Sequence, residues 1–255
     1  MKNFILVSLL AAGSLFAADK KAVFNFDFKS AKGLKLHRKA QVSDGTMKLS
    51  GKGDFASVPG TENVHISNKG ITLIATVKLN DYGKFKAGGK IAHDMFFSKG
   101  KEFIFGRSGK VLYVNFHDGK NWAATTMGAV PVPGVWTQYA ATIEYFNDLA
   151  QGEVGYIVSI FINGEREIVR RIRNVAPKPV QDLIQIGNGF GGGPWFLDGE
   201  FALAKMYNYP MSEAEIAEEF SREKRVKVIR KGFSAVSDSL KNAALSLDKN
   251  NAFCV

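Results

Sequence analysis

The chain has 255 residues, of which 12% are aromatic, and its 34 lysines and arginines against 24 aspartates and glutamates give a formal net charge of +10. This length suits one large domain with a substantial core. Cys254 is the sole cysteine, which excludes an intrachain disulfide and makes stability a matter of packing. The positive excess favours polyanionic partners such as acidic glycans or anionic lipid, whereas the sequence carries no groove-reading motif and nucleic acid is not expected as a partner.

The first residues have the order of a secretory signal. Lys2 precedes an apolar run over residues 4–16, and the small residues Ala17 and Ala18 follow it. We expect residues 1–18 to be a signal peptide and the protein to be exported, that is secreted, periplasmic or on the cell surface. The apolar run is shorter than the roughly 20 residues that span a bilayer, so we expect no transmembrane span after signal removal. An uncleaved anchor is the alternative, because a bulky residue would stand three positions before the cleavage site.

Short segments rich in Val, Ile, Phe, Tyr and Thr fill the chain from residue 22 to about residue 208. Gly, Asn, Asp and Pro separate them at fairly even intervals, which is the pattern of strands and turns in a sandwich or barrel. In the first segment Phe24, Phe26 and Phe28 are expected to share one face. The clearest expected strands are 23–28, 71–79, 111–116 and 136–143.

Three dipeptides predict tight hairpins between these strands. Asp44-Gly45, Asp118-Gly119 and Asn163-Gly164 each join an Asx residue, which tolerates left-handed backbone, to a glycine. No helical pattern of about a dozen residues separates the strands, as a parallel sheet would require. The fold class predicted for residues 22–220 is therefore all-β, a sandwich of two antiparallel sheets.

The composition changes after Pro210. Residues 211–220 predict a helix with Ser212 at the N-cap and Glu215 completing a capping box, and Ile216 and Phe220 are placed to dock on the sandwich. Residues 221–255 are expected to form a C-terminal extension. Its stretch 222–231 is strongly basic and is a candidate polyanion contact.

Two parts of the extension have ambiguous patterns. Residues 226–229 fit either a last strand or a continued helix, and residues 233–247 fit a second amphipathic helix that needs a partner for its apolar face.

Four segments together resemble the concanavalin A-like lectin/glucanase superfamily, in its laminin-G-like (LamG) branch. They are the opening aromatic strand with the Asp44-Gly45 turn, the segment 70–78, the Trp136 strand with the partner ending at Asn163-Gly164, and the run from Ile184 to Ile216. Two departures stand out: Thr76 occupies a position where relatives commonly have tryptophan, and Ala202 and Leu203 occupy positions where many have an Asp-Glu pair.

The resemblance implies a jelly roll of two packed sheets, one of them often concave. Members include lectins, adhesion modules, accessory domains and glycosidases, so the fold alone does not select a function. Relatives often hold calcium at the rim of the sandwich. Asp44, Asp54, Asp81 and Asp118 lie near loops here, but the sequence does not bring them together, and we predict no metal and no cofactor.

The sequence lacks the patterns that glycoside cleavage and metal chemistry need. The glycosidase pattern E-x-D-x-x-E, which sets two carboxylates on one strand face, does not occur; the nearest match is Asp198-Gly199-Glu200. The four histidines, His37, His65, His93 and His117, have no zinc-ligand spacing and are expected to be surface or satisfied residues.

Two tryptophans stand in polar or glycine-rich surroundings that suit sugar binding. Trp122 follows the turn of Asp118 and Asn121, and Trp195 follows a glycine-rich connection that begins near Asn188. We predict these five residues as ligand-binding, with Trp195 alternatively opening a core strand, and we assign Trp136 to packing.

The function predicted first is a non-catalytic carbohydrate-binding (lectin-like) module for a glycan or cell-envelope polymer. The alternative is a structural or adhesive protein-interaction domain of the envelope, and a polysaccharide hydrolase ranks third.

Overall fold

The structure is a computed structural model that describes residues 22–66, 70–80, 93–109, 111–127, 132–175, 178–189 and 195–223. Within these ranges the elements are β1 (Ala22–Phe26), β2 (Lys35–His37), β3 (Gln41–Ser43), β4 (Thr46–Ser50), β5 (Phe55–Val58), β6 (Ile71–Leu79), β7 (His93–Lys99), β8 (Phe103–Ser108), β9 (Val111–His117), β10 (Trp122–Met127), β11 (Thr137–Asp148), β12 (Glu153–Ile162), β13 (Glu165–Arg173), β14 (Ile184–Ile186), β15 (Asp198–Tyr207) and α1 (Glu213–Arg222). The strands confirm the predicted all-β class.

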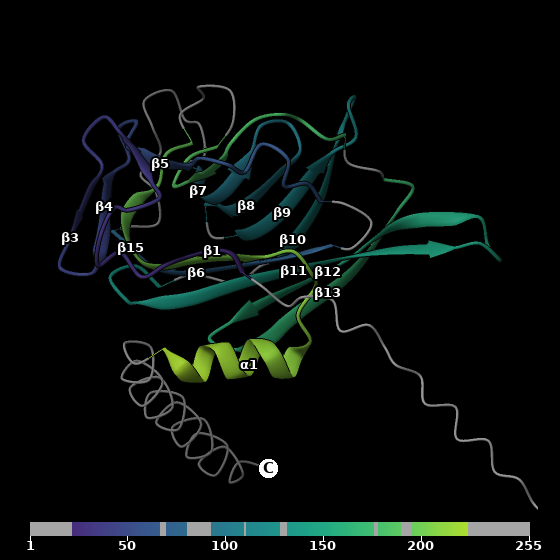
Figure 1. The fold of residues 1–255 in the computed structure, drawn as a ribbon. Coiled ribbons are helices and arrows are strands. Elements are labelled where there is room, and N and C mark those ends of the chain that lie inside the picture. The colour runs from purple at the N-terminus through teal and green to yellow at the C-terminus, as the bar shows by residue number, and fades with distance from the viewer. Residues whose placement is uncertain are drawn as a thin grey trace, which may run out of the picture.

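The strands form two antiparallel sheets packed face to face, with α1 outside them (Figure 1). The seven-stranded sheet has the order β10-β9-β8-β7-β14-β5-β2. The eight-stranded sheet has the order β13-β12-β11-β6-β15-β4-β3, and β1 also pairs with β15. This is possible because β4 pairs with residues 198–201 of β15 and β1 with residues 204–207, so two short strands share one long one.

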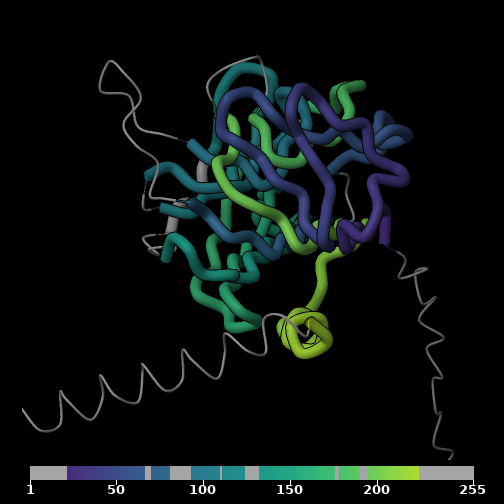
Figure 2. Tube along the Cα trace, turned by 90° about the vertical axis from the view of Figure 1, so that its left-hand side faces the viewer, coloured from purple at the N-terminus to yellow at the C-terminus, as the bar shows by residue number. Residues whose placement is uncertain are grey.

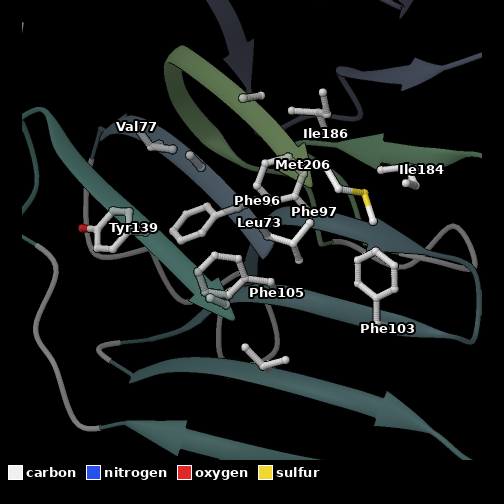
Figure 3. Packing of buried hydrophobic residues seen from close by; sticks show 14 of the residues in the cluster. Leu73, Val77, Phe96, Phe97, Phe103, Phe105, Tyr139, Ile184, Ile186 and Met206 are labelled. Atoms are coloured by element: carbon white, nitrogen blue, oxygen red, sulfur yellow. The ribbon is translucent and has the colours of Figure 1, made fainter. Parts of the chain in front are cut away.

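The core lies between the sheets and is rich in phenylalanine. Leu73 and Val77 of β6 face Phe96 of β7 and Phe105 of β8, and Phe96 stacks on Tyr139 of β11 with ring centroids 5.0 Å apart (Figure 3). These side chains are almost completely buried. Each contributes on the order of 1.5–3 kcal/mol by leaving water, which is the stabilisation that a chain without a disulfide depends on.

Two of the three predicted Asx-Gly turns close their hairpins with both residues in the left-handed region. Asp44 and Gly45 (φ 54° and 67°) join β3 to β4, and Asn163 and Gly164 (φ 51° and 81°) join β12 to β13. This is the geometry whose twist matches that of paired strands. The Asp118-Gly119 turn joins β9 to β10.

The first strand is shorter than predicted. It ends at Phe26, because Phe28 has a φ of 54°, which a strand cannot accommodate. Phe28 is nevertheless buried, with its ring centroid 6.2 Å from that of Phe201. The alternation therefore correctly predicts burial but overestimates the length of the strand.

Helix α1 begins as predicted. The Ser212 hydroxyl accepts a hydrogen bond from the Glu215 N–H, and the Glu215 carboxylate accepts one from the Ser212 N–H, which completes the capping box. Ile216 and Phe220 are buried against the outer face of the eight-stranded sheet, where Phe220 lies so close to Gly164 that any side chain there would collide with it. Figure 2 views α1 along its axis and shows it outside the two layers.

Several predictions fall on residues that the structure does not describe. The signal peptide (1–18) and the two uncertain segments of the extension (226–229 and 233–247) lie outside the described residues, as does most of the basic stretch 222–231. Its first residue, Arg222, is held by Glu218 and Glu219. None of the helices in the described ranges is long and apolar enough to cross a membrane.

Strand β13 forms one edge of the eight-stranded sheet and is unusually basic. Arg170, Arg171 and Arg173 are exposed along it. Arg171 lies 3.4 Å from the Glu153 carboxylate and stacks over the ring of Phe146 at 3.9 Å. The charge of Arg171 is therefore already balanced by contacts within the protein.

One ion pair lies in the interior between the sheets. The guanidinium of Arg107 in β8 is 2.5 Å from the carboxylate of Asp94 in β7, and both side chains are almost inaccessible to solvent. The second Asp94 oxygen accepts a hydrogen bond of 3.0 Å from the Asp198 N–H at the start of β15. Burial raises the pKa of Asp94, while the charge of Arg107 opposes that rise.

Candidate functional site

The side chains that point away from the core on the seven-stranded sheet include an aromatic and polar group. In β9, Leu112, Val114 and Phe116 face the core, so Tyr113, Asn115 and His117 point outward. Outward residues of the neighbouring strands and the segment before β15 join them. We call this set the tryptophan face; its members are His93, Met95, Ile104, Tyr113, Asn115, His117, Trp122 and Trp195.

The two predicted tryptophans lie on this one face although 73 positions separate them in the sequence. Both pack against a buried cluster of Met95, Ile104 and Tyr113, which come from three adjacent strands. Both tryptophans are half-buried. The cluster therefore supports two large rings that still reach solvent.

Trp122 is placed by strand pairing. It stands opposite His117 in the β9–β10 ladder, and the two rings meet edge to face with centroids 4.9 Å apart. The His117 Nδ1 accepts a hydrogen bond of 3.0 Å from the Gly119 N–H. In the neutral ring the proton is therefore on Nε2, which makes that nitrogen a donor.

Trp195 is placed by backbone pairing and by a glycine. The Gly189 N–H donates to the Trp195 carbonyl (3.0 Å), and Asn188 forms a β-bridge with Phe196. A methyl group on Gly189 would lie 2.7 Å from the Trp195 ring, so only glycine lets the ring lie against the backbone at this point. The ring centroid of Trp195 is 5.1 Å from that of His93.

Polar atoms lie among these rings. The Tyr113 hydroxyl is 3.3 Å from His93 Nδ1, and burial, with the Asp94 charge as the second cause, raises the pKa of Tyr113, so the hydroxyl stays protonated. The side-chain oxygens of Asn115 and Asn188 are buried and have no hydrogen-bond partner in the described part of the chain. Such buried acceptors are uncommon in folded proteins.

The other predicted site residues differ in their placement. The Asp118 carboxylate accepts hydrogen bonds from the Asn121 and Lys120 N–H groups, which lower its pKa, so it holds the β9–β10 turn together. Asn121 is exposed in that turn, next to Trp122. Asn188 is buried and donates to the Gln185 side chain at 2.6 Å. The structure thus brings Trp122 and Trp195 together, with Asp118 and Asn121 at their border.

The outward residues of β7 and β9 were not predicted as a group from the sequence. His93 and His117 were expected to be surface or satisfied histidines, and Tyr113 and Asn115 were not among the predicted site residues. The alternation of β9 contains the necessary signal, because a strand whose even-numbered positions face the core must present its odd-numbered positions outward. What it lacks is the order of the strands, which places β7 next to β8 and β9.

Three acidic residues that the sequence analysis considered for calcium binding or catalysis have hydrogen-bond or ion-pair partners within the protein. Asp54, considered for calcium, accepts hydrogen bonds from the Lys39 and Ser50 N–H groups. Glu200 pairs with Lys78 at 2.7 Å, and Asp198 accepts a hydrogen bond of 2.7 Å from Asn80. Across the described ranges, no three His, Cys, Asp or Glu side chains gather as metal ligands would.

A hollow lies on the opposite side of the molecule, between the start of α1 and strands β11 to β13. Its volume is about 380 Å³. Thr142, Ser159 and Phe161 line it, and Arg166 of β13 pairs with Glu213 of α1 at 3.1 Å beside it.

Comparisons with known proteins agree on the fold. The sequence profile of the concanavalin A-like lectin/glucanases superfamily matches residues 50–217. No curated protein sequence matches the chain.

Among solved structures, the receptor-binding domain of botulinum neurotoxin type G has a TM-score of 0.60 at 9% identity, covering 79% of this chain and 51% of that one. The binding domain of botulinum neurotoxin DC, solved in complex with rat synaptotagmin II, has a TM-score of 0.56 at 9% identity, covering 78% of this chain and 51% of that one. Domain 4 of an extracellular arabinanase from Geobacillus stearothermophilus, in complex with arabinotriose, has a TM-score of 0.57 at 13% identity, covering 78% of this chain and 98% of that one. The chain thus spans about half the length of the neurotoxin domains, and at these identities the likeness concerns the fold alone.

Proposed function

We propose that this chain, which belongs to the concanavalin A-like lectin/glucanases superfamily, is an exported, non-catalytic module that binds a glycan through the tryptophan face. The observation that carries the proposal is the convergence of Trp122 and Trp195 on one buried cluster. Large, rigid rings that are fixed from below and reach solvent above are the surfaces on which the apolar C–H faces of sugar rings stack.

The polar members of the face fit the same ligand. A sugar presents hydroxyl groups that both donate and accept hydrogen bonds, and a binding site needs a few placed polar groups among apolar ones. His117 Nε2 is a donor, and the exposed Asn121 amide, which can donate and accept, lies beside Trp122 at the border of the face. The arabinotriose complex of the arabinanase domain supports the idea that this fold can hold a saccharide.

Tryptophan substitutions test the site. The polysaccharide for the test is one that slows the wild-type chain in affinity electrophoresis. Trp122→Ala and Trp195→Ala should each weaken binding to it by about tenfold or more, the loss expected for a ring at the centre of an interface. Trp136→Ala is the matched control, because that ring lies before β11 beneath the Lys78 ammonium, 5.2 Å away, on the other sheet. If all three variants bind as tightly as the wild type, the site is refuted. If all three lose binding to the same extent, the loss comes from a folding defect.

A protein-interaction domain is the second candidate, supported by the hollow beside α1. Its rim includes Val169, a large apolar side chain that is 48% exposed. Val169→Asp should abolish capture of a protein partner in cross-linking on intact cells, whereas Leu149→Asp, at the exposed β11–β12 turn, should not. If both variants cross-link as the wild type does, this hollow is not an interaction site.

Export rests on the order of residues 1–18 and has its own test. N-terminal sequencing of the protein recovered from culture fractions should begin at residue 18 or 19. A chain that keeps residue 1 and stays in the cytoplasmic fraction would contradict it.

A further inference from the structure

The aromatic surface continues beyond the tryptophan face to the far edge of the same sheet. Phe196, next to Trp195 in the chain, has its ring centroid 6.3 Å from that of Phe55, and Phe55 is stacked on His37 with centroids 4.1 Å apart. Phe55 and His37 stand opposite each other in the β2–β5 ladder. They point outward, because the next pair in the ladder, Leu36 and Ala56, packs on the core. From β10 to β2 the sheet spans six strand spacings, about 29 Å at about 4.8 Å each.

Positive charge gathers where this aromatic surface ends. Lys35 points outward two residues before His37, and Arg38 and Lys39 follow in the next turn. Lys52 belongs to the adjacent turn, because the Arg38 guanidinium donates to the Lys52 carbonyl at 3.2 Å. We call Lys35, Arg38, Lys39 and Lys52 the basic edge; all four side chains are exposed.

The basic edge has little negative charge to balance it. Within the described residues, none of its four side chains is within ion-pair distance of a carboxylate. The nearest acid in sequence is Asp54, which is buried and accepts hydrogen bonds from the Lys39 and Ser50 backbones. Elsewhere on the surface some cations are paired, as Lys78 is with Glu200. The basic edge therefore gathers four cations, without an ion pair among the described residues, at the place where the aromatic surface ends.

His37 does not add to this charge near neutral pH. Burial lowers its pKa, and the neighbouring Lys35 lowers it further. A neutral His37 ring stacked on Phe55 is a flat surface rather than a cation, so the aromatic and the cationic parts of the edge are distinct.

We infer that the ligand of the tryptophan face is an acidic polysaccharide, laid across the strands from β10 to β2 with its carboxylate or sulfate groups against the basic edge. The inference rests on the proposed glycan-binding function and adds the ligand's charge and direction to it. Aromatic rings from Trp122 to His37 stack on successive sugars, and the four cations contact the anionic substituents.

The test compares matched polymers with the full chain. Polygalacturonate and its fully methyl-esterified form have the same backbone and differ in charge, and dextran sulfate and dextran form a second such pair. We expect binding to a charged member of at least one pair to exceed binding to its neutral counterpart by about tenfold and to weaken between about 0.05 and 0.3 M salt.

Paired charge variants assign the effect to the basic edge. Lys35→Gln/Lys52→Gln should reduce binding of the charged polymer by about tenfold. Lys48→Gln/Arg170→Gln removes the same charge from β4 and β13 of the other sheet and should change it less than about twofold. All these side chains are exposed, and thermal unfolding would verify that each variant folds.

The outcomes separate this inference from the function on which it rests. Binding to charged and neutral members alike, still lost in Trp122→Ala and Trp195→Ala, leaves glycan binding standing and overturns the acidic preference. Equal weakening by both charge variants assigns the effect to net charge and also overturns it. No binding to any polysaccharide, with the protein folded, refutes the proposed function itself.

Discussion

Replacing Arg107 with methionine should cost this protein more stability than any surface change. Arg107 and Asp94 are both almost fully buried between the sheets, with guanidinium and carboxylate 2.5 Å apart. Methionine keeps the unbranched apolar stem of arginine but removes the charge. The Asp94 carboxylate then remains in the interior, where the Asp198 N–H is the hydrogen-bond donor left to it among the described residues.

The expected loss is about 3–5 kcal/mol, because removing one partner of a buried ion pair leaves the other charge uncompensated. For a domain of roughly 200 residues this corresponds to a fall in Tm of about 6–20 °C, at about 2–4 °C per kcal/mol. The double variant Arg107→Met/Asp94→Asn should be more stable than the sum of the two single losses predicts, since it leaves no buried charge.

The pH dependence gives an independent check. Burial already raises the pKa of Asp94, and loss of the arginine should raise it further. A carboxyl with a folded-state pKa above its unfolded value of about 3.9 contributes stability at low pH and loses it as pH rises through the folded pKa. Urea unfolding should therefore show the deficit of Arg107→Met growing from pH 4 to neutrality, and a deficit that is independent of pH, together with additive single losses, would refute this reasoning.

Three further changes have defined outcomes. Asp54→Asn should lower the free energy of unfolding by about 1–3 kcal/mol at neutral pH. Burial tends to raise the pKa of Asp54, but hydrogen bonds from Ser50 and the Lys39 N–H keep it below the usual value. The wild type should therefore lose this advantage below about pH 4, as urea titrations at several pH values would show. Ile216→Ala, at a fully buried position of α1, should cost about 2–5 kcal/mol in the same assay. Gly189→Ala should shift the tryptophan fluorescence, weaken glycan binding and cost about 1–3 kcal/mol of stability, because its methyl group would lie 2.7 Å from the Trp195 ring and 2.8 Å from Trp195 Cβ.

The fold was predictable because its local signals agree with one another. The bounds predicted for the strand 71–79 match those of β6, the Asn163-Gly164 pair has the left-handed backbone that its residue types favour, and the capping box of Ser212 and Glu215 forms as expected. These features depend on neighbours in sequence. The end of β1 at Phe26 was not predictable, because the left-handed backbone at Phe28 contradicts that residue's own preference and depends on its burial against Phe201.

The site was predictable only in part, since it depends on which strands are neighbours. Residue type singled out Trp122 and Trp195, but their common support by Met95, Ile104 and Tyr113 requires the order of β7, β8 and β9 in the sheet. Asn188 was predicted as a ligand contact from its place in a glycine-rich connection, and the structure shows it buried and in a β-bridge with Phe196, which its residue type does not indicate.

The arginines of β13 have a consequence for the behaviour of the protein in crowded solution. An exposed edge strand of nine residues offers unpaired N–H and C=O groups to any other strand, and it is the kind of edge from which aggregation begins. Another strand that paired with this edge would take water from its charged side chains, among them Arg170, Arg171 and Arg173, and would disturb the ion pairs of Arg171 and Arg173 with Glu153. The density of charge along β13 therefore disfavours the joining of sheets between molecules, whatever ligand the other sheet holds.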